Sequence, residues 1–136
     1  MSDTQPDDHP HRRPDAAPMA APFLEFDLAK ELDELRGDPE WSRGQNAKTI
    51  VKYEDFRIVL VALKTGAKLP DHRTKGRISI HTLTGRLLVR AEGRTFDLPM
   101  GTLMTLDHDL PHNVEALEES TCLLTIAWPR GGKGQV

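Results

Sequence analysis

The sequence predicts an all-β domain, a small barrel of short antiparallel strands preceded by one short helix. Three observations predict this fold class. From residue 46 onward, short apolar runs are separated by turn signals at intervals of about ten residues, which is typical of a β-sandwich or barrel. Apolar and polar residues alternate clearly between positions 86 and 98. One stretch, residues 27–36, has leucines at the spacing of a helix face.

Length and charge limit the class of protein. A chain of 136 residues has room for one domain of ordinary size. The formal charge of −3, from 18 basic and 21 acidic residues, gives no long-range attraction for phosphates or for an anionic membrane surface. We therefore expect neither nucleic acid nor a membrane as a partner.

Cysteine usage and the first residues indicate a compartment. Cys122 is the only cysteine, so an intrachain disulfide and a cysteine-based zinc cluster are both excluded. The first residues are acidic and rich in proline, where a secretory peptide would be basic and then apolar. No apolar run is long enough to span a membrane. We expect a cytoplasmic protein.

The two ends of the chain are expected to lie outside the folded domain. Residues 1–22 hold five of the ten prolines and almost no large apolar side chains, so they bury too little surface to offset the entropy of ordering them. We expect a disordered N-terminal tail there, and a flexible C-terminus over residues 131–136.

Residues 23–45 are expected to form a helix and a lead-in to the barrel. Asp27 is placed as the N-cap of the helix, and Gly37 follows its last turn. One face carries the leucines Leu28, Leu32 and Leu35. So short a helix is marginal by itself, so its leucines are expected to cover the outside of the barrel.

The barrel is expected to span residues 46–130. Eight turn signals divide this region and therefore predict about nine strands. The turns are Glu54-Asp55, Thr65-Gly66, Lys75-Gly76, Gly85, Glu92-Gly93, Pro99 to Gly101, Asp107 to Asp109 and Glu118 to Ser120.

Two kinds of strand pattern are present. Alternation predicts that one set of side chains on either side of the Glu92-Gly93 hairpin faces the core. These residues are Leu87, Val89, Ala91, Phe96 and Leu98. The runs at 56–63 and 123–128 are apolar on both faces, so their second face needs a cover. We therefore expect a homodimer.

Two stretches carry a resemblance to a known family. The first is GAKLPDHRTKGRISIHTLTG, which runs from Gly66 to Gly85, and the second is GTLMTLDHDLPH, which ends at His112. Their order, their internal spacing and the hairpin between them resemble the two motifs of the cupin superfamily, GxxxxxHxHxxxExxxxxxG and GxxxxxPxGxxHxxxN. The resemblance implies a double-stranded β-helix, or jelly-roll, barrel.

The same resemblance implies a site in the mouth of the barrel. In a complete cupin site, two His and one Glu of the first motif and one His of the second hold a divalent metal. Here His72 and His112 match, whereas Thr74 and Ile78 stand at the other two positions. The resemblance therefore implies that these four residues line a ligand cavity.

A metal in that cavity would need a third protein ligand, because catalytic zinc sites use three and iron facial triads use two His and a carboxylate. The nearby candidates are Asp107, His108 and Asp109 in the turn before His112. With one of them, His72 and His112 would complete a site for iron, zinc or manganese.

Two functions remain open. The first is a binding module of unassigned activity that takes a small molecule and has a degenerate metal site, as the loss of the ligands at Thr74 and Ile78 indicates. The alternative is a metal-dependent enzyme of oxygenase or isomerase type that uses His72, His112 and a nearby carboxylate. The sequence names no substrate for either.

Other reactive side chains are expected to have structural roles. Alternation from Ile78 places His81 on the outer face of its strand, unless a β-bulge reverses the pattern. Cys122 lies in an apolar strand and is expected to be a small buried hydrophobe. Three arginines are candidates for binding a carboxylated ligand at the rim or for plain solvated charge: Arg73, Arg77 and Arg90.

Overall fold

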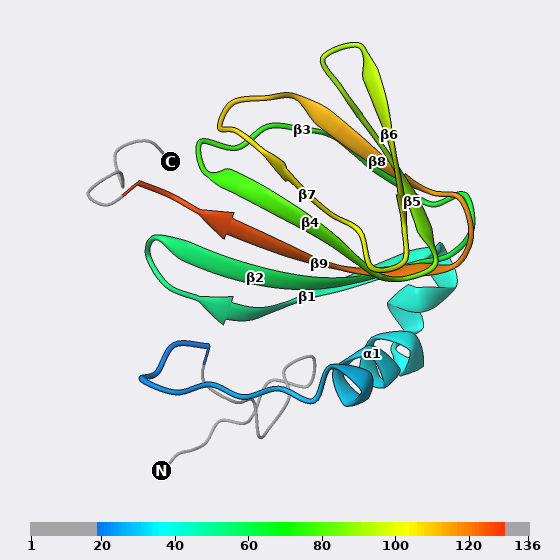
Figure 1. The fold of residues 1–136 in the computed structure, drawn as a ribbon. Helices are drawn as coiled ribbons and strands as arrows, with labels where there is room; N and C mark the ends of the chain where they lie inside the picture. The colour runs from blue at the N-terminus through cyan, green and yellow to red at the C-terminus, as the bar shows by residue number, and fades with distance from the viewer. Residues whose placement is uncertain (1–18, 130–136) are drawn as a thin grey trace.

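The fold consists of two antiparallel β-sheets that face each other, with one α-helix packed on the outside (Figure 1). The computed structural model describes residues 19–129, with the backbone alone at positions 71 and 72. The predicted disordered tail, 1–22, and the predicted flexible end, 131–136, lie almost wholly outside that range. The elements in order are α1 (Leu28–Gly37), the 3-10 helix η2 (Pro39–Arg43), β1 (Gln45–Lys52), β2 (Phe56–Leu63), β3 (Lys68–His72), β4 (Arg77–Thr84), β5 (Arg86–Ala91), β6 (Arg94–Pro99), β7 (Leu103–Leu106), β8 (His112–Ala116) and β9 (Ser120–Ala127).

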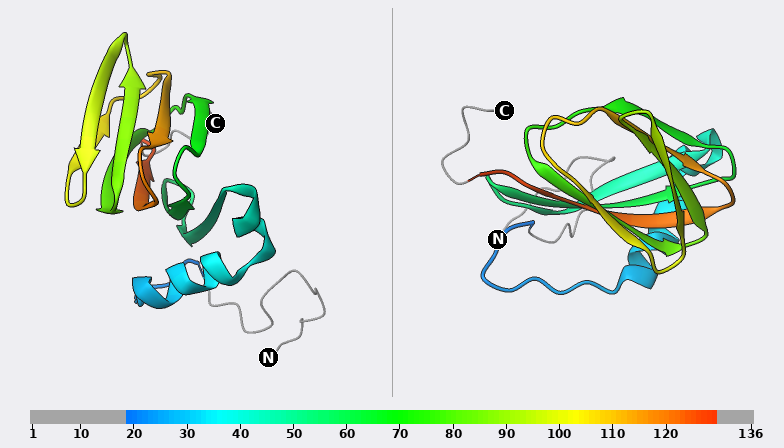
Figure 2. Two further views of the ribbon diagram at one scale, coloured as in Figure 1. Left: turned by 90° about the vertical axis from the view of Figure 1, so that its right-hand side faces the viewer. Right: turned by 45° about the horizontal axis from the view of Figure 1, so that its top comes forward.

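The strand topology is that of a jelly roll. One sheet has the order β1-β2-β9-β4-β7 and the other the order β3-β8-β5-β6, and every pairing is antiparallel. Figure 2 shows the two sheets curving around a common interior. Residues 19–129 contain nine strands, and each of the eight predicted turns lies at a junction between consecutive strands. The predicted all-β fold class is confirmed.

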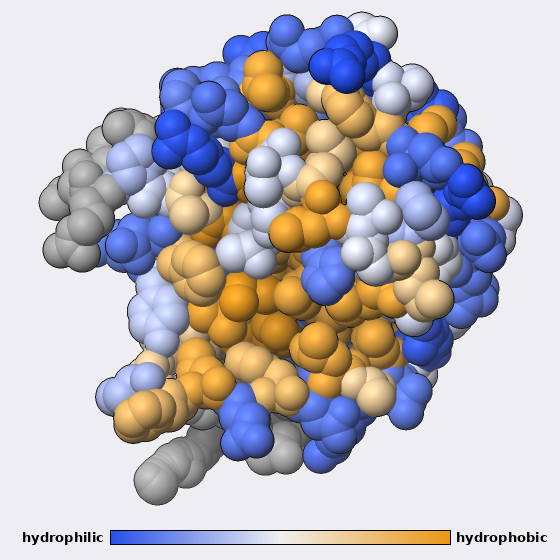
Figure 3. All heavy atoms as spheres, in the orientation of Figure 1, coloured by the Kyte–Doolittle hydropathy of each residue, from blue (hydrophilic) through white to orange (hydrophobic). Residues whose placement is uncertain are grey.

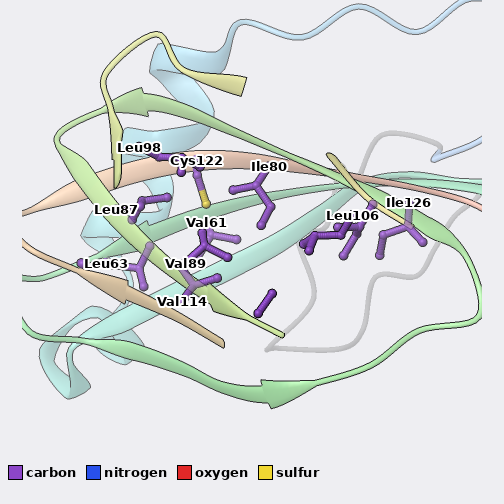
Figure 4. Packing of buried hydrophobic residues seen from close by; sticks show 13 residues of the cluster. Val61, Leu63, Ile80, Leu87, Val89, Leu98, Leu106, Val114, Cys122 and Ile126 are labelled. Carbon is purple, nitrogen blue, oxygen red and sulfur yellow. The ribbon is translucent and has the colours of Figure 1, made fainter. Parts of the chain in front are cut away.

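The interior between the sheets is filled by the apolar side chains that alternation places inward. Leu87, Val89 and Ala91 of β5 are buried, as is Leu98 of β6, while Phe96 packs against them with part of its surface exposed. Figure 4 shows the buried side chains of this cluster projecting from both sheets into the space between them. The predicted core faces of this hairpin are confirmed.

Helix α1 covers part of the outer face of the five-stranded sheet. Asp27 caps it, because its carboxylate accepts a hydrogen bond from the backbone N–H of Lys30 at 3.3 Å. Leu32 and Leu35 are buried against Leu60 and Ala62, which belong to the outward side of β2. The expectation that the leucine stripe covers the outside of the barrel is therefore confirmed. The helix also supplies the predicted cover for the second face of the apolar run at 56–63.

The helix ends slightly later than the sequence predicts. Gly37 is the last helical residue rather than the first beyond the helix. Asp38 is both the C-cap of α1 and the N-cap of η2, where its carboxylate accepts from the backbone N–H of Glu40 at 2.8 Å. Pro39 at the start of η2 prevents α1 from continuing. At ten residues α1 is far shorter than a membrane span, and no other helix within residues 19–129 is long and apolar enough for one.

The residues before α1 lie beside the β1–β2 hairpin. The backbone N–H of Lys52 donates to the carbonyl oxygen of Met19 at 2.8 Å. The hydroxyl of Tyr53 donates to the carbonyl oxygen of Ala21 at 2.6 Å. This part of the chain, which the sequence assigns to the tail, is thus joined to the first hairpin before it reaches the helix (Figure 1).

The turn between β4 and β5 requires glycine. Gly85 has φ +83°, and a Cβ added there would lie 2.3 Å from the carbonyl oxygen of Glu119 and 2.3 Å from Oγ of Ser120. The Ser120 hydroxyl is fixed in this place, because it accepts from the backbone N–H of Arg86 at 2.9 Å and donates to the carbonyl oxygen of Glu118 at 2.7 Å. At the end of the barrel opposite His112, the turn at Gly85 therefore packs directly against the backbone at the start of β9.

Substitution Gly85→Ala is expected to lower the free energy of unfolding by about 3 kcal/mol or more, from left-handed strain and the clash together. The matched control is Gly93→Ala, at φ +71° with no atom within 4 Å of the added Cβ, and it is expected to lose about 1–2 kcal/mol from strain alone. Urea denaturation of the three proteins measures both values. Equal losses for the two variants would contradict the close approach at Gly85.

Candidate ligand-binding site

The pairing of β3 with β8 brings the two predicted histidine positions opposite each other. Leu69 pairs with Val114, and His72 pairs with His112. Directly paired residues of an antiparallel ladder share one face of the sheet. Positions 72 and 112, far apart along the chain, therefore meet on one face at the end of two neighbouring strands.

A bulge in β3 produces this register. Pro70 and Asp71 together stand opposite one residue of β8, Asn113. Without the extra residue, the period of two would put His72 on the face opposite to that of Leu69. Pro70 suits the position, because β3 is an edge strand and a proline lacks the N–H that a ladder would need.

His112 is buried and has a fixed orientation. Its side chain is on the inner face of β8, with 6% of its surface exposed. Its Nδ1 lies 3.0 Å from the carbonyl oxygen of Leu110. Because a carbonyl oxygen only accepts, Nδ1 is the donor in this contact and carries a hydrogen.

A cavity of about 270 Å³ begins at this histidine and extends between the sheets. It is lined by strands of both sheets: β3 and β8 on one side, β4 and β9 on the other. Its lining residues are Leu69, Pro70, Ile78, Ile80, His112, Asn113, Val114, Leu124 and Ile126. Two predicted cavity residues, Ile78 and His112, are thus among them.

Sequence reasoning did not single out the other cavity residues. Alternation from Ile78 makes Ile80 an inward position, whereas the run at 123–128, apolar on both faces, does not mark Ile126 as inward. Alternation also does not say which inward side chains leave space between them. Asn113 belongs to the opposite side of β8 from His112 and reaches the cavity lining only beside the bulge. No sequence signal marks such a position.

The acidic turn before His112 lies at the surface. The side chains of Asp107, His108 and Asp109 are 61%, 54% and 40% exposed. Asp107 accepts from the backbone N–H of His108 and from Nε of Arg77, both at 2.8 Å. These two interactions, the backbone one first, hold the pKa of Asp107 below its usual range. The Asp107 carboxylate is therefore engaged on the outside of the barrel.

Two further features of this end bear on a metal. Thr74 lies in the turn between β3 and β4, where its hydroxyl accepts from the backbone N–H of Gly76 at 3.2 Å. Among the side chains that the structure describes, no three of His, Cys, Asp and Glu come close enough to hold a metal ion. Ile78, at the motif's Glu position, is 4% exposed and presents only carbon to the cavity. The described side chains alone therefore do not supply the three converging donors of a zinc or iron site.

The remaining singled-out residues lie away from the cavity. The register of β4 runs without a bulge from Arg77 to Thr82, so His81 is on the outer face, as alternation predicts. Cys122 is fully buried, and burial raises the pKa of its thiol to about 12. Arg90 is on the outside of the four-stranded sheet, where it donates to Glu115 at 2.8 Å.

Comparison with known proteins supports the fold. No family model and no curated protein matches the chain. Among solved structures, an RmlC-like cupin protein from Desulfovibrio desulfuricans is 27% identical, with a TM-score of 0.59 over 63% of this chain and 84% of that one. The structure of KdgF from a Halomonas species is 23% identical, with a TM-score of 0.58 over 65% of this chain and 84% of that one.

A larger enzyme matches more of the chain. A mutant of salicylate 1,2-dioxygenase from Pseudoaminobacter salicylatoxidans is 16% identical with a TM-score of 0.72. The match covers 88% of this chain but 40% of the enzyme, so the chain spans about two fifths of that protein's length. The likenesses together confirm that the chain is a small domain of the cupin fold, which the two motifs predict.

Proposed function

We propose that this cupin-fold domain is a binding module, in which the space between the two sheets takes a small organic molecule without a resident metal centre. The observation that carries the proposal is the lining of the cavity next to His112. Seven of its nine lining residues are apolar, and they come from both sheets. A concave, largely apolar site with few polar groups is the common form of a small-molecule site.

The chemistry of the cavity wall is the reason for proposing a metal-free site. A divalent ion between His72 and His112 would lie next to the buried side chain of Ile78, where water and carboxylates are both replaced by carbon. Burying a charge without compensating ligands is costly. The carboxylate of Asp107 would have to leave Arg77 and turn inward to compensate it. A neutral organic ligand requires neither change.

The fold itself favours no particular reaction, because one fold hosts many unrelated activities. The structural neighbours carry names as different as KdgF and salicylate 1,2-dioxygenase. The function therefore has to be argued from this chain's own cavity. The proposed role for His72 and His112 is to form the polar end of the cavity, where one polar group of a ligand meets imidazole.

Metal analysis separates this proposal from a metal-dependent enzyme. Untagged protein is expected to contain well under one equivalent of iron, zinc and manganese, both as the wild type and as the His72→Ala, His112→Ala double variant. Addition of these ions is expected to leave the melting temperature of the wild type unchanged, since a ligand bound to the folded state would raise it. Elemental mass spectrometry measures the metal content, and a thermal melt measures the melting temperature.

The opposite result is equally definite. Stoichiometric metal in the wild type that disappears in the double variant would contradict the metal-free module. It would support an enzyme of oxygenase or isomerase type, in which His72, His112 and a nearby carboxylate bind the ion. The variant Asp107→Asn would then test whether that carboxylate is a ligand, because it keeps the size of the side chain and removes its charge.

We also propose that two copies of the chain associate through the outer face of the five-stranded sheet. Beyond Leu60, which α1 covers, the register continues one row through Leu123, His81 and Leu103 across β9, β4 and β7. Leu103 is 59% exposed. Figure 3 shows apolar side chains gathered over the middle of this face of the molecule. An exposed apolar patch of this kind marks a contact surface.

A second copy is the occupant that the chain's own surface favours. The segment before α1, drawn in blue in Figure 1, runs beside the β1–β2 hairpin and carries Phe23, which is 93% exposed. One chain thus presents both a projecting apolar side chain and an apolar sheet face. A two-fold symmetric dimer allows each copy to cover the other's exposed side chains. The small net charge of −3 opposes this only weakly.

The dimer is expected to be broken by Leu103→Glu, because a carboxylate in the centre of an apolar interface loses its water without gaining a partner. We expect the dissociation constant to rise by about 100-fold or more. The matched control is Leu117→Glu, at a position that is 42% exposed in the turn between β8 and β9. Light scattering after size exclusion measures the mass. A wild type that is monomeric at high concentration would refute this association.

A further inference from the structure

The cavity next to His112 contains no described charge that a charged ligand could pair with. Two nearby arginines are outside the barrel and already paired: Arg90 donates to Glu115 and Arg77 to Asp107, each at 2.8 Å. Neither Arg77 nor Asp107 lines the cavity. A ligand carboxylate or phosphate that entered between the sheets would leave water and meet no permanent positive charge among the described lining side chains, which is unfavourable.

The number of polar partners limits how many hydroxyl groups a ligand can carry. Among the described lining residues, only His112 and Asn113 have polar side chains, and Oδ1 of Asn113 already accepts from Arg90 at 3.3 Å. The wall that faces them consists of aliphatic side chains of β4 and β9, namely Ile78, Ile80, Leu124 and Ile126. Each hydroxyl buried against such a wall without a partner lowers affinity. A polyol such as a sugar would bury several.

The size of the cavity limits the ligand to roughly one ring. Its volume of about 270 Å³ lies between two reference values. An engineered apolar cavity of about 150 Å³ binds benzene, and sites for drug-sized ligands usually begin at about 300 Å³. The cavity is therefore large enough for a substituted six-membered ring or a short branched chain.

We propose that the ligand of this barrel is a neutral molecule the size of a single ring, apolar over most of its surface and carrying one or two polar groups at the end that meets His112. This inference rests on the proposed binding function and names its ligand class.

Matched probes test the ligand class. Cyclohexanol and myo-inositol have the same ring and differ in carrying one hydroxyl or six, and toluene and benzoate differ in one negative charge. The readout is the methyl spectrum of full-length protein labelled at the isoleucine δ1 positions. Five isoleucines are present, of which Ile78, Ile80 and Ile126 line the cavity, while Ile50 and Ile58 do not and serve as internal controls.

Cyclohexanol and toluene are expected to shift the three cavity methyl signals in a saturable manner and to leave the two control signals in place. Cyclohexanol is expected to bind at least roughly tenfold more tightly than myo-inositol, and toluene at least roughly tenfold more tightly than benzoate, since even one unpaired polar group costs this much.

The outcomes distinguish the ligand class from the binding function itself. If myo-inositol or benzoate shifts the cavity signals at lower concentration than its apolar partner, the ligand class is wrong and the binding function stands. If none of the four probes moves the cavity signals while the control signals also stay in place, both are wrong. If the apolar probes move all five signals alike, binding is non-specific and the inference is refuted.

Discussion

The position of the candidate site depends on one backbone feature, the bulge in β3 at which Pro70 and Asp71 stand opposite Asn113. Leu69 faces the interior with Val114, and the bulge shifts the period of two so that position 72 is on the same face as His112. The bulge costs little free energy at this place, because β3 is an edge strand and Pro70 has no N–H to leave unpaired.

The rest of the barrel determines what that histidine end can do. The sheet opposite it contributes aliphatic side chains from β4 and β9, so the cavity has one polar end and an apolar body. The carboxylate of Asp107, a candidate metal ligand, lies on the outer rim, where it accepts from Arg77 and from the backbone N–H of His108. The proposed binding by shape and apolar contact rests on these residues, whereas chemistry at a metal needs three converging donors.

Much of the fold could be predicted because its turns are written locally in the sequence. Gly85 and the Glu92-Gly93 pair have positive φ values and lie in the two tight turns on either side of β5, and glycine is the residue that such turns favour. Alternation then predicted the buried side of β5 and the outward placing of His81. The location of Asp107 could not be predicted, since a turn carboxylate points inward or outward according to partners that are distant in sequence. The residues that line the cavity could not be predicted either, because the space between two sheets depends on how the sheets pack.

The most direct test of the central claim is the register of β3 on β8, measured by cross-strand nuclear Overhauser effects between backbone protons. The bulged pairing predicts contacts between Leu69 and Val114 and between His72 and His112. A regular ladder from the same starting pair would instead give a contact between Asp71 and His112. Observation of that second pattern would place position 72 on the face of the sheet opposite to His112 and would contradict the account.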